Sequence, residues 1–162
     1  MTNLDERRYV EVPFGRAQEY VRRYVRDVRA NHAGRLTLSV ATPVRRTDAD
    51  AVELREDVLV DFAGAIDETH LTDPIAIAWR PARGGGTLPS FAGFLVVAHD
   101  ESYDSCRIML EGAYEPPLGA VGALFDAMVG HAVAKASARR LLETIGRAIE
   151  QMYRAPSIAS SL

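Results

Sequence analysis

The C-terminal stretch formed by residues 114–152 constrains the fold more than any other part of the chain. We interpret it as one long helix that is entered through the Pro116-Pro117 step and closes the chain. Most of the sequence before it has the alternating pattern of β-strands. Strands of this kind need an apolar partner around which the sheet can curl, and the long helix is the natural candidate.

The segments before this helix are predicted to be one further helix and a series of strands. Residues 8–12 form a short first strand, and Pro13 ends it and suits the first turn of a helix. Apolar residues at helical spacing continue this helix until Asn31 and Gly34 end it. The predicted strands that follow span residues 35–42, 52–62, 74–81, 90–99 and 103–114.

The connections have the residues of turns and loops. Residues 43–50 are predicted to be a polar turn, and residues 64–73 a break between strands. The three glycines at residues 84–86 predict a flexible loop rather than a phosphate site, because no helix start and no Lys-Ser/Thr pair follows. Within the strand formed by residues 52–62, Glu56 breaks the pattern by lying on the apolar side.

The last two predicted strands form a hairpin with residues 100–102 between them. A two-residue turn at Glu101-Ser102 places Val97 opposite Cys106 and makes that cysteine an inert thiol of the core. The same turn pairs Leu95 with Ile108 and Gly93 with Leu110. The opposite face is too apolar for a fully wetted surface, which predicts a dimer contact or a covering segment. That face carries Phe94, Val96, Arg107, Met109 and Glu111.

Placing the residues of the long helix at about 100° each gives two apolar stripes nearly half a turn apart. The first stripe consists of Leu118, Val121, Phe125, Val129, Ala132 and Ala136, and farther along it carries Arg139, Arg140, Glu143, Arg147 and Glu150. The second consists of Leu141, Ile145, Ala148, Ile149 and Met152, and it continues backwards as Ala120, Ala123, Ala127, Ala134 and Ala138, with His131 at its margin.

Two arrangements explain these stripes. A straight helix would turn the second stripe to the sheet, and its small early residues would leave a volume there that is either collapsed or open to a ligand. The first stripe would then need cover from the N-terminal helix or from a second subunit. A break near Gly130 would instead rotate the first stripe inward.

The N-terminal helix has a basic side with two interpretations. It carries Arg16, Arg22, Arg23, Arg26 and Arg29, against Glu19 and Asp27. This side is either a solvated helix surface or a site for an acidic partner or lipid headgroups.

Length, charge and cysteine content limit the class of protein. The 162 residues suit one domain, here residues 1–162, with residues 154–162 expected to be a disordered tail. A net charge of −3 argues against nucleic acid as the main partner. The single Cys106 predicts a reducing compartment, and with no export signal or membrane span in the sequence we expect a cytoplasmic protein.

Strands gathered together with separate helices predict an α+β fold in which a curved antiparallel sheet wraps a long C-terminal helix. The order resembles the helix-grip fold of the START / polyketide cyclase / birch-pollen-allergen (SRPBCC) superfamily, in its bacterial branch. The residues that carry the resemblance are the G-x-Y-x-P-P sequence at residues 112–117, Gly119, Gly122, Asp126, Ala132, residues 140–142, and the segments 77–79 and 91–93. One departure is a single helix after the first strand, where many members have two.

The resemblance implies a deep, mostly apolar pocket between helix and sheet that holds a small hydrophobic molecule such as a lipid, sterol or polyketide. The side chains expected to line it are Val58, Val60, Phe62, Ile77, Trp79, Leu95, Ile108, Tyr114, Ala123, Ala127, His131 and Ala134. No cofactor is expected. No metal is expected either, because no His pair has ligand spacing.

The sequence is compatible with a protein that catalyses a reaction and with one that only binds its ligand. A cyclase- or hydratase-type enzyme would use His131 or a buried carboxylate, for which Glu56 and Glu111 are the candidates. No G-x-S-x-G sequence marks a nucleophilic serine, and a pair of His99 with Asp104 would lie at the surface. A carrier or sensor without catalysis is the first hypothesis, this enzyme is the second, and a homodimeric interaction module is the third.

Overall fold

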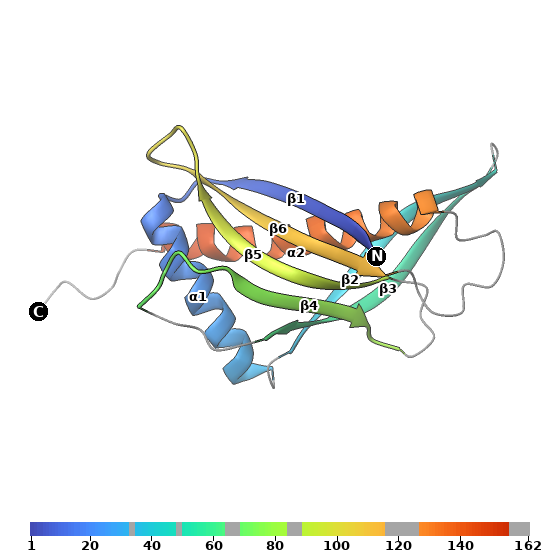
Figure 1. Ribbon diagram of the computed structural model, residues 1–162, viewed down its shortest axis with the longest axis horizontal. Helices are drawn as coiled ribbons and strands as arrows, with labels where there is room; N and C mark the ends of the chain where they lie inside the picture. The colour runs from blue at the N-terminus through green and yellow to red at the C-terminus, as the bar shows by residue number, and fades with distance from the viewer. Residues whose placement is uncertain (33–34, 48–49, 64–68, 84–88, 116–126, 156–162) are drawn as a thin grey trace, which may run out of the picture.

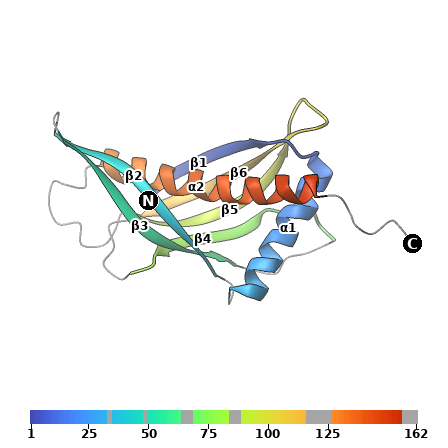
Figure 2. The ribbon, with the colours of Figure 1, turned by 180° about the vertical axis from the view of Figure 1, so that it is seen from behind.

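The computed structural model describes residues 1–32, 35–47, 50–63, 69–83, 89–115 and 127–155. Its elements are β1 (Thr2–Val10), α1 (Phe14–Asn31), β2 (Arg35–Thr47), β3 (Asp50–Phe62), β4 (Ile75–Pro81), β5 (Ser90–His99), β6 (Cys106–Glu115) and α2 (Ala127–Arg154). The strands form one antiparallel sheet in the order β1-β6-β5-β4-β3-β2. The sheet curls around α2, and α1 crosses one end of it (Figures 1 and 2). The predicted α+β fold is confirmed.

Strand β1 is longer than predicted. The charged residues near its start conceal the alternation of inward and outward side chains in the sequence. Leu4 and Glu6 point inward and are buried, between exposed neighbours. Glu6 is tolerated there because Lys135 Nζ and Arg139 Nε of α2 lie 3.3 and 3.1 Å from its carboxylate oxygens. A buried carboxylate held by two cations is therefore part of the contact between β1 and α2.

The polar turn predicted for residues 43–50 was wrong. Strand β2 continues to Thr47, with Pro43 opposite Glu53 in its ladder. Proline is tolerated because β2 is an edge strand, where a missing backbone N–H removes no ladder hydrogen bond. Residues 48–49, and the predicted loop at residues 84–86, lie outside the described residues.

The predicted register of β5 with β6 was wrong by two residues. Val97 faces Ile108, Leu95 faces Leu110 and Gly93 faces Gly112, because the connection runs from residue 100 to 105. An even shift leaves each side chain on its expected face, since strand side chains alternate with a period of two. His99 does not join Asp104 in a pair; its ring stacks on Phe14 with centroids 3.6 Å apart.

Paired glycines allow β5 and β6 to bend tightly. A Cβ on Gly93 would lie 2.2 Å from the carbonyl oxygen of Glu111, and one on Gly112 would lie 2.4 Å from that of Ala92. The ring of Phe91 also covers both positions on the concave face. Only the missing side chains let the backbones and this ring meet here.

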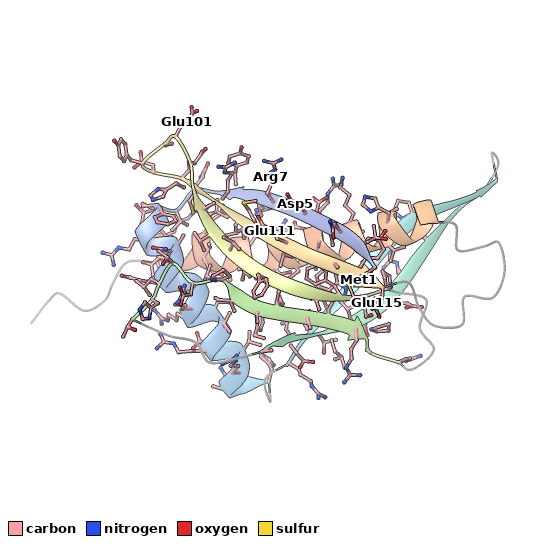
Figure 3. The ribbon with its side chains drawn as sticks, viewed as in Figure 1. Met1, Asp5, Arg7, Glu101, Glu111 and Glu115 are labelled. Carbon is pink, nitrogen blue, oxygen red and sulfur yellow. The ribbon has the colours of Figure 1, made fainter. Side chains whose placement is uncertain are left out.

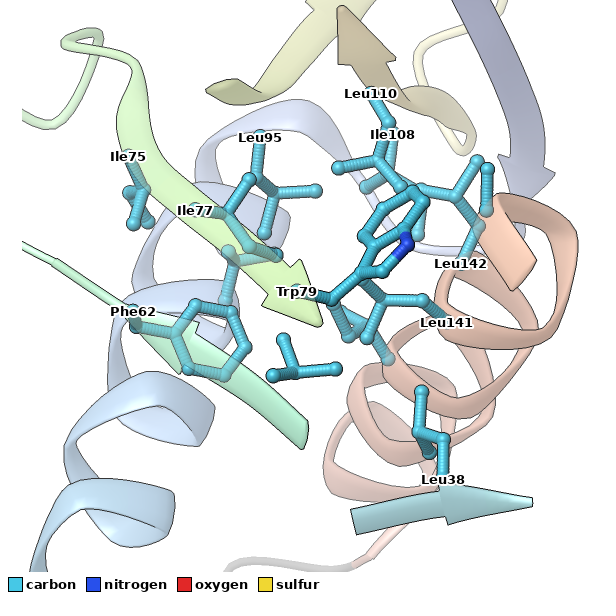
Figure 4. Close-up of a cluster of buried hydrophobic side chains, with 14 of the residues drawn as sticks. Leu38, Phe62, Ile75, Ile77, Trp79, Leu95, Ile108, Leu110, Leu141 and Leu142 are labelled. Atoms are coloured by element: carbon cyan, nitrogen blue, oxygen red, sulfur yellow. The ribbon is translucent and has the colours of Figure 1, made fainter. Parts of the chain in front are cut away.

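Helix α2 continues through Gly130 to Arg154 without interruption, as expected for a straight helix over the described residues. Its second stripe is buried at Ala134, Ala138, Leu141, Ile145 and Ile149, whereas Ala132 is exposed. The earlier parts of both stripes, in residues 116–126, lie outside the described residues, as do residues 156–162 of the predicted tail. Figure 4 shows Leu141 and Leu142 of α2 facing the side chains of the sheet.

Two arginines of α1 hold the connection between β3 and β4. Arg22 is buried and its Nη2 donates hydrogen bonds of 2.9 Å to the carbonyl oxygens of His70 and Asp73. Arg29 donates from Nε and Nη2 to the carbonyl oxygen of Phe62. These two residues of the basic side are therefore structural.

We expect Gly93→Ala to lower the free energy of unfolding by at least about 2 kcal/mol, because the new methyl group meets backbone on the neighbouring strand. Gly130→Ala is the matched control, since an added Cβ there meets no described atom within 4 Å. It should raise stability by about 0.5–1 kcal/mol through helix propensity. Chemical denaturation measures both, and a neutral Gly93→Ala would contradict the close approach.

Burial, with a smaller contribution from Asp100, raises the pKa of the Cys106 thiol from 9.0 to about 11. The folded chain therefore keeps a proton that the unfolded chain releases, so this stabilising contribution is complete below pH 9 and is lost as the pH rises to 11. We expect Cys106 to resist Ellman's reagent at pH 8 until denaturant is added. Rapid labelling of the native protein would contradict its burial.

Candidate ligand-binding site

Most of the predicted lining residues meet in one buried cluster on the concave side of the sheet. These are Val58, Val60, Phe62, Ile77, Trp79, Leu95, Ile108, Tyr114 and Ala134. His131 is exposed on α2, and Ala127 is the first residue of that helix. Ala123 lies outside the described residues, and so does the side chain of Ala127. Whether the cluster lines a ligand pocket stays a prediction.

A half-open hollow of about 1290 Å³ lies beside this cluster, between α2 and the hairpin of β2 and β3. The described residues that line it are Ser39, Val40, Ala41, Thr42, Pro43, Arg55, Glu56, Asp57, Ala82, Arg83, Ala132, Lys135, Ala136, Arg139, Arg140 and Glu143. None of the predicted lining residues is among them. The hollow continues the buried cluster, because Val58 follows Glu56 on the same face of β3.

The position of α2 explains why space remains on this side. Gly146 lets α2 approach β1 closely, since an added Cβ would lie 2.5 Å from Arg8 Nε and 3.2 Å from Val10 Cγ1. Toward β2 the helix presents the small side chains of Ala132 and Ala136, which do not fill the gap. The sequence indicated this gap through the first stripe of the helix, which has small residues at Ala132 and Ala136. Its charged continuation at residues 139–143 forms part of the rim.

Thr42 and Trp79 each carry a buried polar atom that has no hydrogen-bond partner among the described residues. The hydroxyl of Thr42, which is 3% exposed, lies in the lining of the hollow, and the indole N–H of Trp79, which is 2% exposed, lies in the cluster behind it. Trp79 stacks on Phe91 with ring centroids 4.1 Å apart, and Figure 4 shows it between β4 and α2. Each unsatisfied group costs roughly 1–3 kcal/mol, which a ligand or a water molecule would recover.

Charged side chains surround the rim of the hollow. Ser39 donates a hydrogen bond of 2.6 Å to Asp57 Oδ1, and Arg55 Nη2 lies 3.0 Å from Glu53 Oε2. Glu56 is half-buried and interacts with another group of the protein. The hollow therefore combines apolar side chains, one buried hydroxyl and a charged opening, an arrangement that suits a small molecule with both apolar and polar parts.

A tyrosine and a histidine meet at the start of the described part of α2. The hydroxyl of Tyr114 lies 3.3 Å from Nδ1 of His131, with the phenol buried and the imidazole exposed. Among the described residues, no third side chain makes a hydrogen bond that would orient this imidazole as a catalytic base. Glu111, the other carboxylate candidate, is exposed on the outer face.

The described residues contain no group of three or more His, Cys, Asp or Glu side chains placed to hold a metal ion. No helix in the described part of the chain is long and apolar enough to cross a membrane.

Comparison with known proteins finds similarity in structure alone. No protein-family model and no curated protein matches the sequence. The Zhui aromatase/cyclase from Streptomyces sp. R1128 superimposes with a TM-score of 0.50 at 8% identity, over 99% of this chain and 99% of its own. The chain has the helix-grip fold. The fold implied by the sequence resemblance is thus confirmed.

Two other solved structures are similar over most of their length. TTHA0849 from Thermus thermophilus has a TM-score of 0.47 at 15% identity, over 93% of this chain and 99% of its own. Ara h 8.0201 has a TM-score of 0.48 at 14% identity, over 93% of this chain and 96% of its own.

We expect Thr42→Val to raise the free energy of unfolding by about 1 kcal/mol, because it keeps the shape of the side chain and removes a buried hydroxyl that has no partner among the described residues. Chemical denaturation of the ligand-free protein is the measurement. Ser137→Ala is the control, since Ser137 is also buried but its hydroxyl donates to the carbonyl oxygen of Val133 at 3.0 Å. A loss of stability in Thr42→Val would show that its hydroxyl has a partner.

Proposed function

We propose that this protein binds a small, largely hydrophobic molecule between α2 and the sheet, and carries or senses it without chemical change. The observation that carries the proposal is the hollow of about 1290 Å³ beside the apolar cluster. Ligand pockets of roughly 300–1,000 Å³ hold molecules of this kind, so the space is sufficient even though part of it is open to solvent.

The walls of the hollow support an apolar ligand. Val40 lies on the concave face of β2, and Ala132 and Ala136 lie on the facing side of α2. From there Val58 leads into the buried cluster that contains Val60 and the other predicted lining residues. We propose that the ligand lies along Val40 and Ala136 and reaches inward toward Val58.

The enzymatic alternative has one observation in its favour, the contact between Tyr114 and His131. The Streptomyces protein of the same fold is named an aromatase/cyclase, which makes a cyclase-type reaction the form that this alternative takes. It requires a substrate atom within reach of the imidazole. Because the hollow is lined by other residues, we rank binding first.

A homodimer stays a prediction. The outer face of the sheet exposes Phe94 on β5 and Tyr9 on β1. Figure 3 shows Asp5, Arg7 and Glu111 on the neighbouring strands β1 and β6, where Asp5 lies directly opposite Glu111. Apolar side chains there alternate with charges. The cytoplasmic location is likewise part of the proposal, and it depends on the single free cysteine.

We expect the neutral probe N-phenyl-1-naphthylamine to bind with enhanced fluorescence, and Ala136→Phe to weaken its binding at least about tenfold by filling the hollow. Gln151→Phe, an equal change at an exposed position of α2, should leave binding within about twofold of wild type. Trp79 is the single tryptophan, so energy transfer from it to the probe reports that the probe is bound, and the two variants locate the probe.

Circular dichroism verifies that both variants fold. Absence of probe binding to the wild-type protein would reject the proposal. Equal binding by Ala136→Phe and Gln151→Phe would place the ligand elsewhere than in the hollow.

A further inference from the structure

The hollow has a charge opposite in sign to that of the chain as a whole. The chain carries a net charge of −3, whereas the basic residues in the described lining outnumber the acidic ones by five to three. The basic residues are Arg55, Arg83, Lys135, Arg139 and Arg140, and the acidic ones are Glu56, Asp57 and Glu143. A cleft with an excess of one sign of charge concentrates ligands of the other sign.

Part of this positive excess remains after ion pairing, because one carboxylate can pair with two cations of α2. Glu6 holds both Lys135 and Arg139, at 3.3 and 3.1 Å. Glu143 likewise holds Arg140, at 3.6 Å, and Arg147. The group around Glu6 keeps one positive charge beside the hollow, whereas the second cation around Glu143 is Arg147, which does not line the hollow.

The facing wall adds a hydroxyl donor that has no partner in the described part of the chain. Thr42 lies in the lining on β2, its side chain is nine-tenths buried or more, and its Oγ1 makes no hydrogen bond to any described residue. A hydroxyl can donate to an oxyanion, and such charge-assisted hydrogen bonds are stronger than neutral ones. This atom points to a ligand oxygen independently of the charges on α2.

The change from polar to apolar residues along β3 orients such a ligand. Glu56 faces Val40 in the ladder, one step inward from Thr42 on the concave face. Val58, the next residue on that face, is buried and accepts an apolar group. The oxyanion therefore belongs at the outer part of the hollow, beside Thr42 and the arginines.

We propose that the ligand is an amphipathic anion, an apolar molecule with one oxyanion group such as a carboxylate or a phosphate ester. This inference rests on the proposed binding function and adds the class of ligand. The oxyanion lies at the rim near Arg83 and Arg140, accepts a hydrogen bond from Thr42 Oγ1, and leaves the apolar part against Val40 and Ala136.

The test is competition against N-phenyl-1-naphthylamine by three molecules of ten carbons each that carry different head groups: decanoate, 1-decanol and decylammonium. At pH 7.5 and low salt, decanoate should displace the probe at least about tenfold better than decanol, and decylammonium should be the weakest. Added salt should reduce the advantage of decanoate, because the rim is open to solvent.

Two arginines that share one carboxylate provide a matched pair of variants. Arg140→Gln should weaken the binding of decanoate about three- to tenfold and leave the binding of decanol within about twofold of wild type. Arg147→Gln removes the other partner of Glu143 but does not line the hollow, so it should change neither. Thr42→Val should weaken decanoate about three- to tenfold although the variant is expected to be more stable.

Other outcomes separate this inference from the proposed function. If decanol displaces the probe as well as decanoate does, or if both arginine variants behave alike, the anionic class is rejected and hydrophobic binding stands. Decyl phosphate in place of decanoate distinguishes a phosphate ester from a carboxylate. Displacement by inorganic phosphate alone would overturn the amphipathic class. Failure of all three molecules, with no probe binding, would reject both proposals.

Discussion

The docking of α2 against β1 is the contact on which the rest of the structure depends. Gly146 allows Arg8 and Val10 to lie directly against the helix axis, and Glu6 joins the two elements through cations of α2. Toward the other edge of the sheet the same helix presents the small side chains of Ala132 and Ala136, and the hollow lies there.

The curvature of the sheet has a similarly local origin. Gly93 and Gly112 face each other across β5 and β6, where the backbones approach too closely for any side chain. Phe91 covers this pair and stacks on Trp79, so the bend and the packing of the aromatic rings form one unit. The ring of Trp79 is held by this packing, while its N–H lacks a partner among the described residues.

The sequence predicted the fold well because its strongest patterns are periodic. Alternation identified the strands, and the angular analysis of the last helix identified the stripe from Ala134 to Ile149 that contacts the sheet. The errors occurred where periodicity carries no information. The length of the connection at residues 100–105 fixes the register of β5 with β6, and Glu6 among the charges of β1 has an inward position that only its partners on α2 explain.

The lining of the hollow was not predicted from the sequence, for a physical reason. Apolar side chains on the concave face fill the interior and also border any pocket, so burial alone does not separate the two roles. The informative residues were those that broke the pattern: Glu56 on the apolar side of β3, and the stripe that changes from Ala132 and Ala136 to charged residues. Both were visible in the sequence, but their meeting across one hollow depends on how β2 crosses α2.

The pairing of β1 with β6 also determines when the fold can form. Val10 lies opposite Cys106, about a hundred residues later in the chain, and α2 contacts β1 from still farther along. During synthesis the first strand therefore leaves the ribosome long before its partner exists, and α1 and the hairpin of β2 and β3 are the units that can form early. Closure of the sheet around the helix is therefore a late step of folding. Until then Leu4 and Val10, which are buried in the folded chain, remain exposed to solvent or to chaperones.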